Sequence, residues 1–391
     1  MLFEEPDDSK IEYLSEEYVL FEGRIEISKF VWKKILERHD KKTIYTYLHS
    51  LVKKHNIPFP YREYTDTEVF NDFSNLKNIN SFNNVQYAPW MSSKIEFDLD
   101  YTYNGQGVYL KQGLQGRTCS DLFAQKERMK CDTSQRKSPI FHWENYAYVF
   151  NPLISFNAEK VSYSEIRSAV GLTAYIPSQF SPVIAKTIYE IFDGKNVLDL
   201  SMGWGDRLVG ALASNIDSYT GIDPNSNMHP QYAKINSFYK HNKRTRFICQ
   251  PAEDVELDAN QFDMIFTSPP YFDRERYSDE DTQSWKRYGT NVESWLNGFL
   301  FKVMRNSYDW LKDGGRLILN INDVSKTPFC KEMLDYALEL GFTYEGVIGY
   351  GMQSRPGKNT STEVVIYEPM FVWVKGRSKN KIQVEPTDTL F

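Results

Sequence analysis

The chain has 391 residues and a net charge of −6, with 41% hydrophobic and 15% aromatic residues. This length accommodates two or three domains with a large core, and the acidic balance excludes a uniformly basic nucleic-acid coat. The first ten residues lack a signal-peptide pattern, and no apolar run reaches membrane-spanning length. We therefore expect no membrane partner and a cytoplasmic protein, associated with the nucleoid or, if viral, inside the host cell. Reduced thiols and no metal site are expected from the spacing of Cys119, Cys131, Cys249 and Cys330.

Residues 1–165 differ in character from the rest of the chain. Residues 27–56 have helical periodicity, and residues 94–103 alternate like a strand that ends at an Asn-Gly turn. Residues 59–64 and 71–84 are rich in Asn, Pro, Ser and aromatic residues, which predicts irregular connections. The expected core positions of the helical stretch are Phe30, Val31, Ile35, Tyr45, Tyr47, Leu48 and Val52.

A basic segment follows at residues 111–137, which holds seven basic and three acidic residues and has a net charge of +4. Such a segment is able to contact phosphates, although a solvated surface loop has the same composition. Arg117, Lys126 and Arg128 are the candidates for substrate contacts on the first interpretation.

A nucleotide site is predicted further along. Residues 196–200 form a short apolar run, the loop Ser201-Met202-Gly203-Trp204-Gly205 follows, and residues 208–213 are compatible with a helix. Glycines allow the backbone to approach a ligand closely, and the helix N-terminus favours negative charge. The next apolar run, residues 219–222, ends in Asp223, about twenty residues after the loop, where such folds place an acid on ribose hydroxyls.

Two more strands lead to the most informative motif. Residues 246–249 run into Glu253 and Asp254, and residues 262–266 run into Ser268-Pro269-Pro270-Tyr271. Polar, glycine or proline residues thus follow four successive strands, as expected at the ligand edge of a doubly wound sheet. Two prolines fix φ, so the neighbouring carbonyls point in rigid directions and can accept hydrogen bonds from a planar amine. Tyr271 offers a stacking surface, although a strand-ending turn with ordinary core packing is the alternative interpretation.

With these motifs, residues 175–375 resemble the S-adenosylmethionine-dependent amino-methyltransferases of DNA, which act on cytosine N4 or adenine N6. The resemblance implies an α/β fold, the Rossmann-like class I fold, with a doubly wound, mostly parallel seven-stranded sheet and a closing β-hairpin that includes residues 364–374. It also implies an N-terminal α+β extension. We expect a target-recognition region at residues 1–165, a catalytic domain at 166–377 and a flexible tail at 378–391, because no long segment separates or follows the two motifs.

The resemblance also implies roles for individual residues. S-adenosylmethionine is the expected cofactor, and Ser268, Pro269, Pro270 and Tyr271 are the expected catalytic residues. Phe272 and Arg355 join the three basic candidates as substrate contacts. Cofactor-binding roles are implied for Phe180, Ser181, Pro182, Asp199, Ser201, Gly203, Trp204, Gly205, Asp223, Glu253 and Asp254.

The expected reaction is methyl transfer to the exocyclic amine of a flipped base in double-stranded DNA. Serine at position 268, in place of an acid or amide, favours cytosine N4 over adenine N6. Two alternatives remain open at this point. One is the same chemistry on RNA or on a protein glutamine, and the other is a catalytically silent protein that binds nucleic acid.

Overall fold

The computed structural model describes residues 11–87, 99, 101–271, 274–324, 327–351 and 367–376. Internal contacts divide the chain into two compact units, Met1–Glu63 with Lys126–Pro177 and Tyr64–Gln125 with Ser178–Phe391. The boundary predicted at residue 165 does not match this division, because residues 64–125 belong to the larger unit. Among the described residues, no helix has both the length and the apolar character needed to cross a bilayer.

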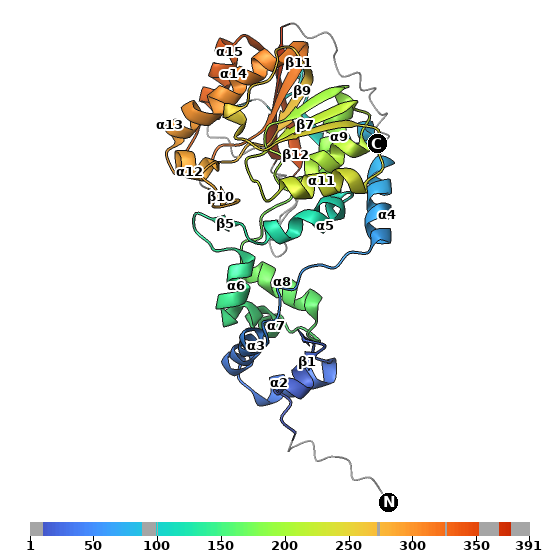
Figure 1. The fold of residues 1–391 in the computed structure, drawn as a ribbon, viewed down its shortest axis with the longest axis vertical. Coiled ribbons are helices and arrows are strands. Elements are labelled where there is room, and N and C mark those ends of the chain that lie inside the picture. Colours follow the sequence, from blue (N-terminus) through green and yellow to red (C-terminus); the bar gives the residue numbers. More distant parts are fainter. Residues whose placement is uncertain are drawn as a thin grey trace, which may run out of the picture. The chain divides into compact units, whose positions relative to one another are not determined.

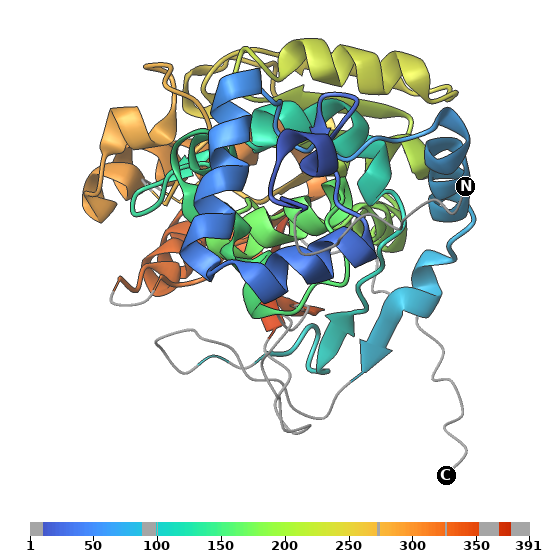
Figure 2. The ribbon, with the colours of Figure 1, turned by 90° about the horizontal axis from the view of Figure 1, so that it is seen from below.

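The smaller unit is mainly helical. Ser28 and Asp40 cap α2 and α3 by accepting hydrogen bonds from main-chain N–H groups, and Figure 2 shows these two helices, both blue, running in different directions from their short connection. Phe30 was predicted in the core but is 58% exposed, because the buried face of α2 is formed by Trp32 and Ile35. The elements are α1 (Glu16–Val19), β1 (Leu20–Phe21), β2 (Arg24–Ile25), α2 (Lys29–Arg38), α3 (Lys41–His55), β5 (Asp132–Thr133), α6 (Pro139–Asn145), η3 (Ala147–Phe150), α7 (Asn151–Ser155) and α8 (Tyr163–Thr173).

The larger unit contains a sheet of nine described strands in the order β3-β4-β12-β13-β11-β9-β6-β7-β8. The strands β8, β7, β6, β9 and β11 pair in parallel, whereas β13 pairs antiparallel with both β11 and β12. The chain moves outward from β6 to β8 and then returns to the other side of β6 with β9. This arrangement is a doubly wound sheet with an antiparallel closing pair, and it confirms the predicted class I fold.

The predicted strands appear close to their expected positions as β6 (Asn196–Asp199), β7 (Ser218–Ile222), β8 (Arg244–Ile248), β9 (Phe262–Thr267) and β11 (Leu311–Asn320). The closing pair consists of β12 (Phe342–Gly351) and β13 (Tyr367–Lys375), and residues 364–366 of the predicted hairpin lie outside the described residues. The predicted tail at 378–391 also lies outside them.

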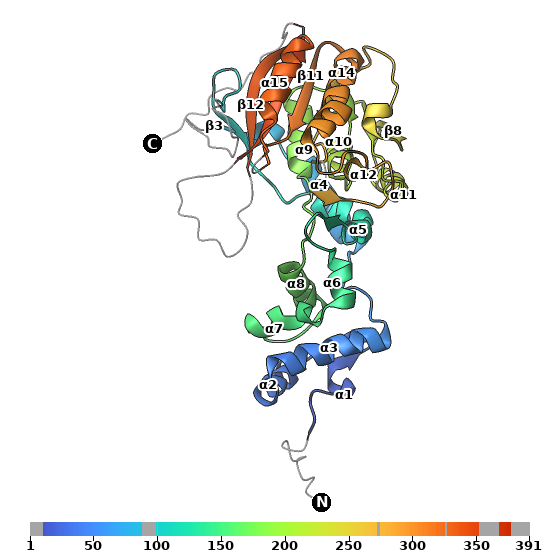
Figure 3. The ribbon, with the colours of Figure 1, turned by 90° about the vertical axis from the view of Figure 1, so that its left-hand side faces the viewer.

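Helices cover both faces of this sheet. Figures 1 and 3 show α14 and α15 on one face, and Figure 1 shows α9 and α11 on the other. Leu198, Ile265 and Leu319 of the sheet and Met304 of α14 belong to one buried cluster. The covering elements are α9 (Pro182–Ile191), α10 (Asp206–Ala213), α11 (His229–Phe238), η4 (Ala252–Asp254), β10 (Glu275–Arg276), α12 (Ser284–Tyr288), α13 (Val292–Trp295), the π-helix η5 (Leu296–Leu300), α14 (Phe301–Trp310) and α15 (Cys330–Glu339).

Residues 64–125 extend this sheet. They form α4 (Asp66–Lys77), η2 (Ser81–Asn84), β3 (Val85–Tyr87) and β4 (Val108–Leu110), and they begin α5 (Arg117–Arg128). β4 pairs in parallel with β12, a partner more than 200 residues later in the chain. The irregular connection predicted at residues 71–84 is wrong for α4, which begins after the cap Thr65 and buries Val69, Phe73 and Leu76. Most of the strand predicted at residues 94–103 lies outside the described residues.

Candidate active site

The reversal of strand order places the ends of β6 and β9 side by side. Leu198 of β6 lies opposite Ile265 of β9 in parallel register, so the loops that follow the two strands leave the same edge of the sheet. In open α/β sheets this edge, at the point of reversal, forms the crevice in which ligands bind. The glycine loop after β6 and the Ser-Pro-Pro-Tyr loop after β9 both start here.

The glycine loop has backbone conformations that favour glycine. Gly203 has φ +55° and Gly205 has φ +84°, and the first helical turn of α10 starts directly after Gly205. A Cβ added at Gly205 would lie 2.8 Å from Ile235 Cδ1. Within the described parts of the chain, one added at Gly203 would have a single atom within 4 Å, the Ser201 oxygen at 4.0 Å. Gly205 is therefore needed for packing against α11, and Gly203 borders open space in which a ligand can approach the backbone.

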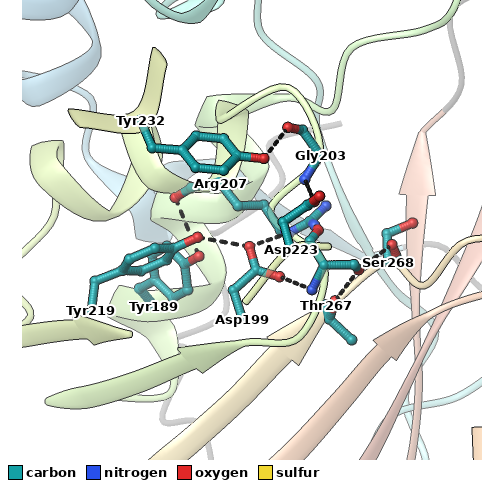
Figure 4. Close-up of polar contacts among 10 residues, drawn as sticks. Tyr189, Asp199, Gly203, Arg207, Tyr219, Asp223, Tyr232, Thr267 and Ser268 are labelled. Carbon is teal, nitrogen blue, oxygen red and sulfur yellow. Dashed lines mark hydrogen bonds and ion pairs between the residues drawn. The ribbon is translucent and has the colours of Figure 1, made fainter. Parts of the chain in front are cut away.

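Asp199 holds this loop from below (Figure 4). Its Oδ2 accepts hydrogen bonds from Arg207 Nε at 2.9 Å and from the Tyr219 hydroxyl at 2.7 Å, and its Oδ1 accepts one from the Ser201 amide. The Asp199 and Arg207 side chains are 0% and 5% exposed. Arg207 Nη2 also donates to the Ser201 carbonyl. Asp199 thus fixes the shape of the loop and uses both carboxylate oxygens inside the protein.

Asp223 stands at the end of β7, next to the glycine loop. Its Oδ2 accepts a hydrogen bond from the Gly203 amide at 2.8 Å (Figure 4), and its Oδ1 accepts one from the Asn225 amide at 2.9 Å. Burial raises the pKa of Asp223 to about 6, and the two amide hydrogen bonds oppose this rise. A carboxylate offers about four acceptor positions, so two amides leave room for the hydroxyls of a ribose.

Ser201 connects the glycine loop directly to the second loop. Its hydroxyl donates to the Ser268 carbonyl oxygen at 2.9 Å and lies 2.7 Å from Thr267 Oγ1 (Figure 4). Because the Ser201 proton is used on the carbonyl, the Thr267 hydroxyl is the donor in the second contact. Thr267 is buried, so this link is held inside the protein. The positions of the two loops are therefore fixed relative to each other.

The Ser-Pro-Pro-Tyr loop keeps its predicted acceptors available. Within the described part of the chain, neither Ser268 Oγ nor the Pro269 carbonyl has a protein donor. Tyr271 is held at its hydroxyl, which accepts the Asn322 amide at 2.8 Å, while its ring lies 6.4 Å from the Phe329 ring. The edge of the sheet therefore orients this aromatic ring firmly.

The predicted segment at Phe180, Ser181 and Pro182 divides into two parts. Phe180 lies beside the loops, with its ring 5.3 Å from Arg207 Cζ and 5.4 Å from the Tyr350 ring. Ser181 is buried and donates to the Gly113 carbonyl, and Pro182 opens α9. The structure thus places Phe180 near the loops, whereas Ser181 and Pro182 support the helix behind them.

Glu253 and Asp254, at the end of the third strand, are paired with the segment that follows the Ser-Pro-Pro-Tyr loop. Arg287 Nη1 lies 2.6 Å from Glu253 Oε1 and 2.8 Å from Asp254 Oδ2, and the Tyr288 hydroxyl donates to Glu253. Burial raises the pKa of Glu253, and its hydrogen bond from Tyr288 opposes the rise.

A second connection holds the same segment near Asp223. Glu280 accepts hydrogen bonds from the Ser226 amide and hydroxyl. Farther along the site, the ring of Trp204, which is buried, lies edge-on to Tyr277 at 5.3 Å. Residues 274–289 therefore contact the ends of β7 and β8, where the cofactor site was predicted.

The basic candidates differ in accessibility. Arg128 is 8% exposed and donates to the Pro177 carbonyl at 3.0 Å, so its guanidinium is engaged inside the protein. Arg117 is half-buried beside Gln112, whereas Lys126 is exposed near the Tyr61 ring. Phe272 and Arg355 lie outside the described residues.

Three residues at the site were missed from the sequence. Arg207 lies next to an apolar helical stretch in the sequence. A charged residue in such a stretch needs a buried carboxylate partner, and this need could have revealed its role. Glu368 was visible as a lone acid within an apolar strand, and Asn322 as a polar residue just after β11.

The residues present fit S-adenosylmethionine. Open space beside Gly203, a buried carboxyl at the end of β7 and a helix N-terminus after the glycine loop form an arrangement that suits a nucleoside cofactor. Within the described residues, no cluster of His, Cys, Asp or Glu could hold a metal ion.

The fold is that of class I S-adenosylmethionine-dependent methyltransferases, and the loops at its edge have the arrangement that this cofactor needs. Residues 262–389, which begin with β9 and the Ser-Pro-Pro-Tyr loop, match the family model described as DNA methylase, which covers N6 and N4 methyltransferases. The match supports a similarity to the DNA amino-methyltransferases and makes S-adenosylmethionine the expected cofactor. A search of curated protein sequences gives no significant match.

Solved structures with similarity to the chain include a methyltransferase from Pyrococcus furiosus, at 15% identity over 51% of this chain and 84% of that one, with a TM-score of 0.32. A putative S-adenosyl-L-methionine-dependent methyltransferase from Methanococcus maripaludis has 15% identity over 51% and 86%, with a TM-score of 0.33. The tRNA (m1A58) methyltransferase TrmI from Aquifex aeolicus has 12% identity over 51% and 70%, also with a TM-score of 0.33.

Proposed function

We propose that this protein transfers a methyl group from S-adenosylmethionine to the exocyclic amine of a base in double-stranded DNA, with cytosine N4 as the first target and adenine N6 as the second. The observation that carries this proposal is the hydrogen bond from Ser201 to the Ser268 carbonyl. It sets the cofactor loop and the amine-binding loop at one fixed separation, as a direct transfer between two bound molecules requires.

The acceptors of the second loop suit an amine. When bound, S-adenosylmethionine supplies an activated methyl group. Ser268 Oγ and the Pro269 carbonyl oxygen accept hydrogen bonds from the two N–H groups of the amine. These hydrogen bonds favour a pyramidal nitrogen, whose lone pair then points toward the methyl donor. These hydrogen bonds are stronger in the transition state than with the planar amine, which is the difference that catalysis needs.

The Tyr271 ring is the surface on which the base stacks in this proposal. A base that has left the helix loses its stacking partners, and an oriented aromatic ring replaces them. The Asn322 amide fixes the Tyr271 hydroxyl, so the direction of the ring is set before the base arrives. Phe272 follows in the sequence and is proposed as a second contact with the base.

The neutral serine at position 268 favours cytosine. It accepts one hydrogen bond without bringing a charge to the amine, and no general base is needed because the proton can leave after transfer. In this proposal Glu253 and Asp254 lie beside the adenine ring of the cofactor. Asp223 accepts hydrogen bonds from its ribose hydroxyls.

DNA contacts are proposed for the smaller unit and for the basic segment. Lys126 and Arg136 are exposed and so are available to phosphates, whereas Lys130 and Lys137 are engaged with Glu127 and Asp132. The contribution of Lys126 and Arg136 to DNA affinity is expected to depend strongly on the salt concentration. The match to the DNA methylase family supports DNA over RNA.

The test is incubation with methyl-labelled S-adenosylmethionine and, separately, duplex DNA, RNA or protein. Label in DNA supports the proposal. Label in RNA or on a protein glutamine alone would replace the substrate, and label in none of them would favour a catalytically silent protein. Ser268→Ala is the matched control, since it removes one acceptor and leaves the cofactor site intact.

A further inference from the structure

Beside the Ser-Pro-Pro-Tyr loop, the antiparallel strands bring a row of polar side chains to the same edge of the sheet. Tyr350 of β12 lies directly opposite Glu368 of β13. Asn320 of β11 lies opposite Met370, so Asn322, two residues farther along, comes level with Glu368. Directly opposed residues of antiparallel strands have side chains on the same face, which places these groups together.

This row lies between the cofactor loop and the catalytic tyrosine. The Tyr350 ring is 5.4 Å from the Phe180 ring, which stacks over Arg207 beneath the glycine loop. On the other side, the main-chain N–H of Asn322 donates a hydrogen bond to the Tyr271 hydroxyl. Burial raises the pKa of Tyr271 well above its ordinary value, and the charge of Glu368 adds to this rise. Because Asn322 is level with Glu368 and its main-chain N–H bonds to the Tyr271 hydroxyl, we place Glu368 near the position where a base stacked on Tyr271 would lie.

The chemistry of this row is that of a site for a polar ligand. Burial raises the pKa of Glu368, Asn320 opposes the rise and Glu275 adds to it. In the described part of the chain, no cationic side chain forms an ion pair with Glu368. Among the residues that the structure describes, the buried Oδ1 atom of Asn322 has no hydrogen-bond partner. Buried polar atoms without partners cost stability and call for an explanation, which a bound ligand can supply.

We propose that Glu368 is a substrate-specificity residue, whose carboxyl, in its protonated form, donates a hydrogen bond to the ring nitrogen next to the reacting amine. This inference rests on the proposed function and names how its site reads the base. A neutral carboxyl is a donor, whereas a carboxylate only accepts. Cytosine N3 and adenine N1 both accept a hydrogen bond and both adjoin the exocyclic amine. On its Watson–Crick edge guanine has N1–H next to its amine, so this edge offers no acceptor to the same group.

The hydrogen bond also orients the base. With the amine on Ser268 and Pro269 and the adjacent nitrogen on Glu368, only one edge of the ring fits the pocket. A base stacked on Tyr271 in the opposite orientation would leave the Glu368 proton without an acceptor. Discrimination by a site built around hydrogen bonds is strong for this reason, since a wrong ligand leaves its polar groups unpaired.

The experiment compares wild type, Glu368→Ala and Glu368→Gln on two duplexes. One carries the mapped target base, and the other carries its deaza analogue, in which the ring nitrogen is replaced by C–H. We expect Glu368→Ala to lower kcat/KM on the normal base by about tenfold, the upper range for the loss of one hydrogen bond. Glu368→Gln retains a donor and should stay within a few-fold of wild type. Wild type should lose a similar factor on the deaza base, and Glu368→Ala should lose little more.

Cofactor affinity, measured for each variant, and Glu339→Ala on the exposed side of α15 are the controls. Equal kcat/KM for wild type and Glu368→Ala would overturn the inference, as would a full deaza penalty in Glu368→Ala. Loss of cofactor binding in Glu368→Ala would indicate a structural role and would also overturn it. These outcomes leave methyl transfer by wild type intact. A wild-type protein that methylates neither duplex would instead overturn the proposed function, and this role of Glu368 with it.

Discussion

The Ser201 hydroxyl donates a hydrogen bond to the Ser268 carbonyl oxygen across 2.9 Å, and the bond joins two loops that are 67 residues apart in sequence. The first loop borders the proposed cofactor site and the second offers acceptors for an amine. Because the Ser201 hydroxyl is used inside the protein, we propose that it positions the second loop.

Ser201→Ala should therefore lower kcat while cofactor affinity changes little. A shift of about 1 Å between reacting groups costs up to about a hundredfold in rate, so we expect a loss of tenfold to a hundredfold. Isothermal titration and single-turnover kinetics measure the two quantities. Ser218→Ala is the matched control, because the Ser218 hydroxyl bonds to Asn196 at the start of the two strands, far from the loops. Equal losses of cofactor affinity and of kcat would contradict the positioning role.

Cofactor affinity should depend on the charge of Asp223. Its pKa is raised to about 6 from an ordinary value of 3.8, so in the free protein the group is ionised above pH 6 and neutral below it. Ribose hydroxyls donate to the ionised form, so affinity should be full above pH 7 and fall by about tenfold at pH 5, one unit below the pKa. Asp223→Asn should bind more weakly and without this pH dependence. A wild-type affinity that is constant from pH 5 to pH 8 would show that Asp223 does not act through its charge.

Removal of Arg207 should destabilise the protein strongly. Arg207→Ala leaves the Asp199 carboxylate buried without its cationic partner, and breaking a buried pair in this way costs about 3–5 kcal/mol. Denaturant unfolding measures this cost. The exposed pair Lys195–Asp193 provides the comparison, since Lys195→Ala should cost less than about 1 kcal/mol. Similar costs for the two substitutions would mean that the buried pair does not support the loop.

The ring and the hydroxyl of Tyr271 should have separable effects. Tyr271→Phe keeps the stacking surface and loses the acceptor for the Asn322 amide, so turnover should fall by less than about tenfold, the effect of a single neutral hydrogen bond. Tyr271→Ala removes the ring and should abolish turnover while cofactor binding survives. Full activity of Tyr271→Ala on the true substrate would exclude the stacking role.

The strands of the catalytic sheet could be predicted because each is a short apolar run that ends in polar, glycine or proline residues. The doubly wound class followed from the same pattern, since a glycine loop and an acid at successive strand ends are typical of such sheets. Positions such as Gly203 and Asp223 were therefore placed correctly at one edge.

Contacts between distant segments could not be predicted in the same way. The pairing of β4 with β12 depends on residues that are more than 200 positions apart, and no local pattern marks it. Arg128 is part of a basic segment in the sequence, but it turns inward to the Pro177 carbonyl in the fold. Local composition gives the number of charges, whereas tertiary structure decides which of them reach the surface.

Nucleoside mass spectrometry is the most direct test of methyl transfer to an exocyclic amine. Duplex DNA is incubated with trideuteromethyl S-adenosylmethionine and wild type or Ser268→Ala, and is then digested to nucleosides. With wild type we expect deuterated N4-methylcytosine or, as the second target, deuterated N6-methyladenine. With Ser268→Ala we expect neither product. Deuterated 5-methylcytosine, which is methylated at carbon, or unmodified nucleosides with wild type would contradict methyl transfer to an exocyclic amine.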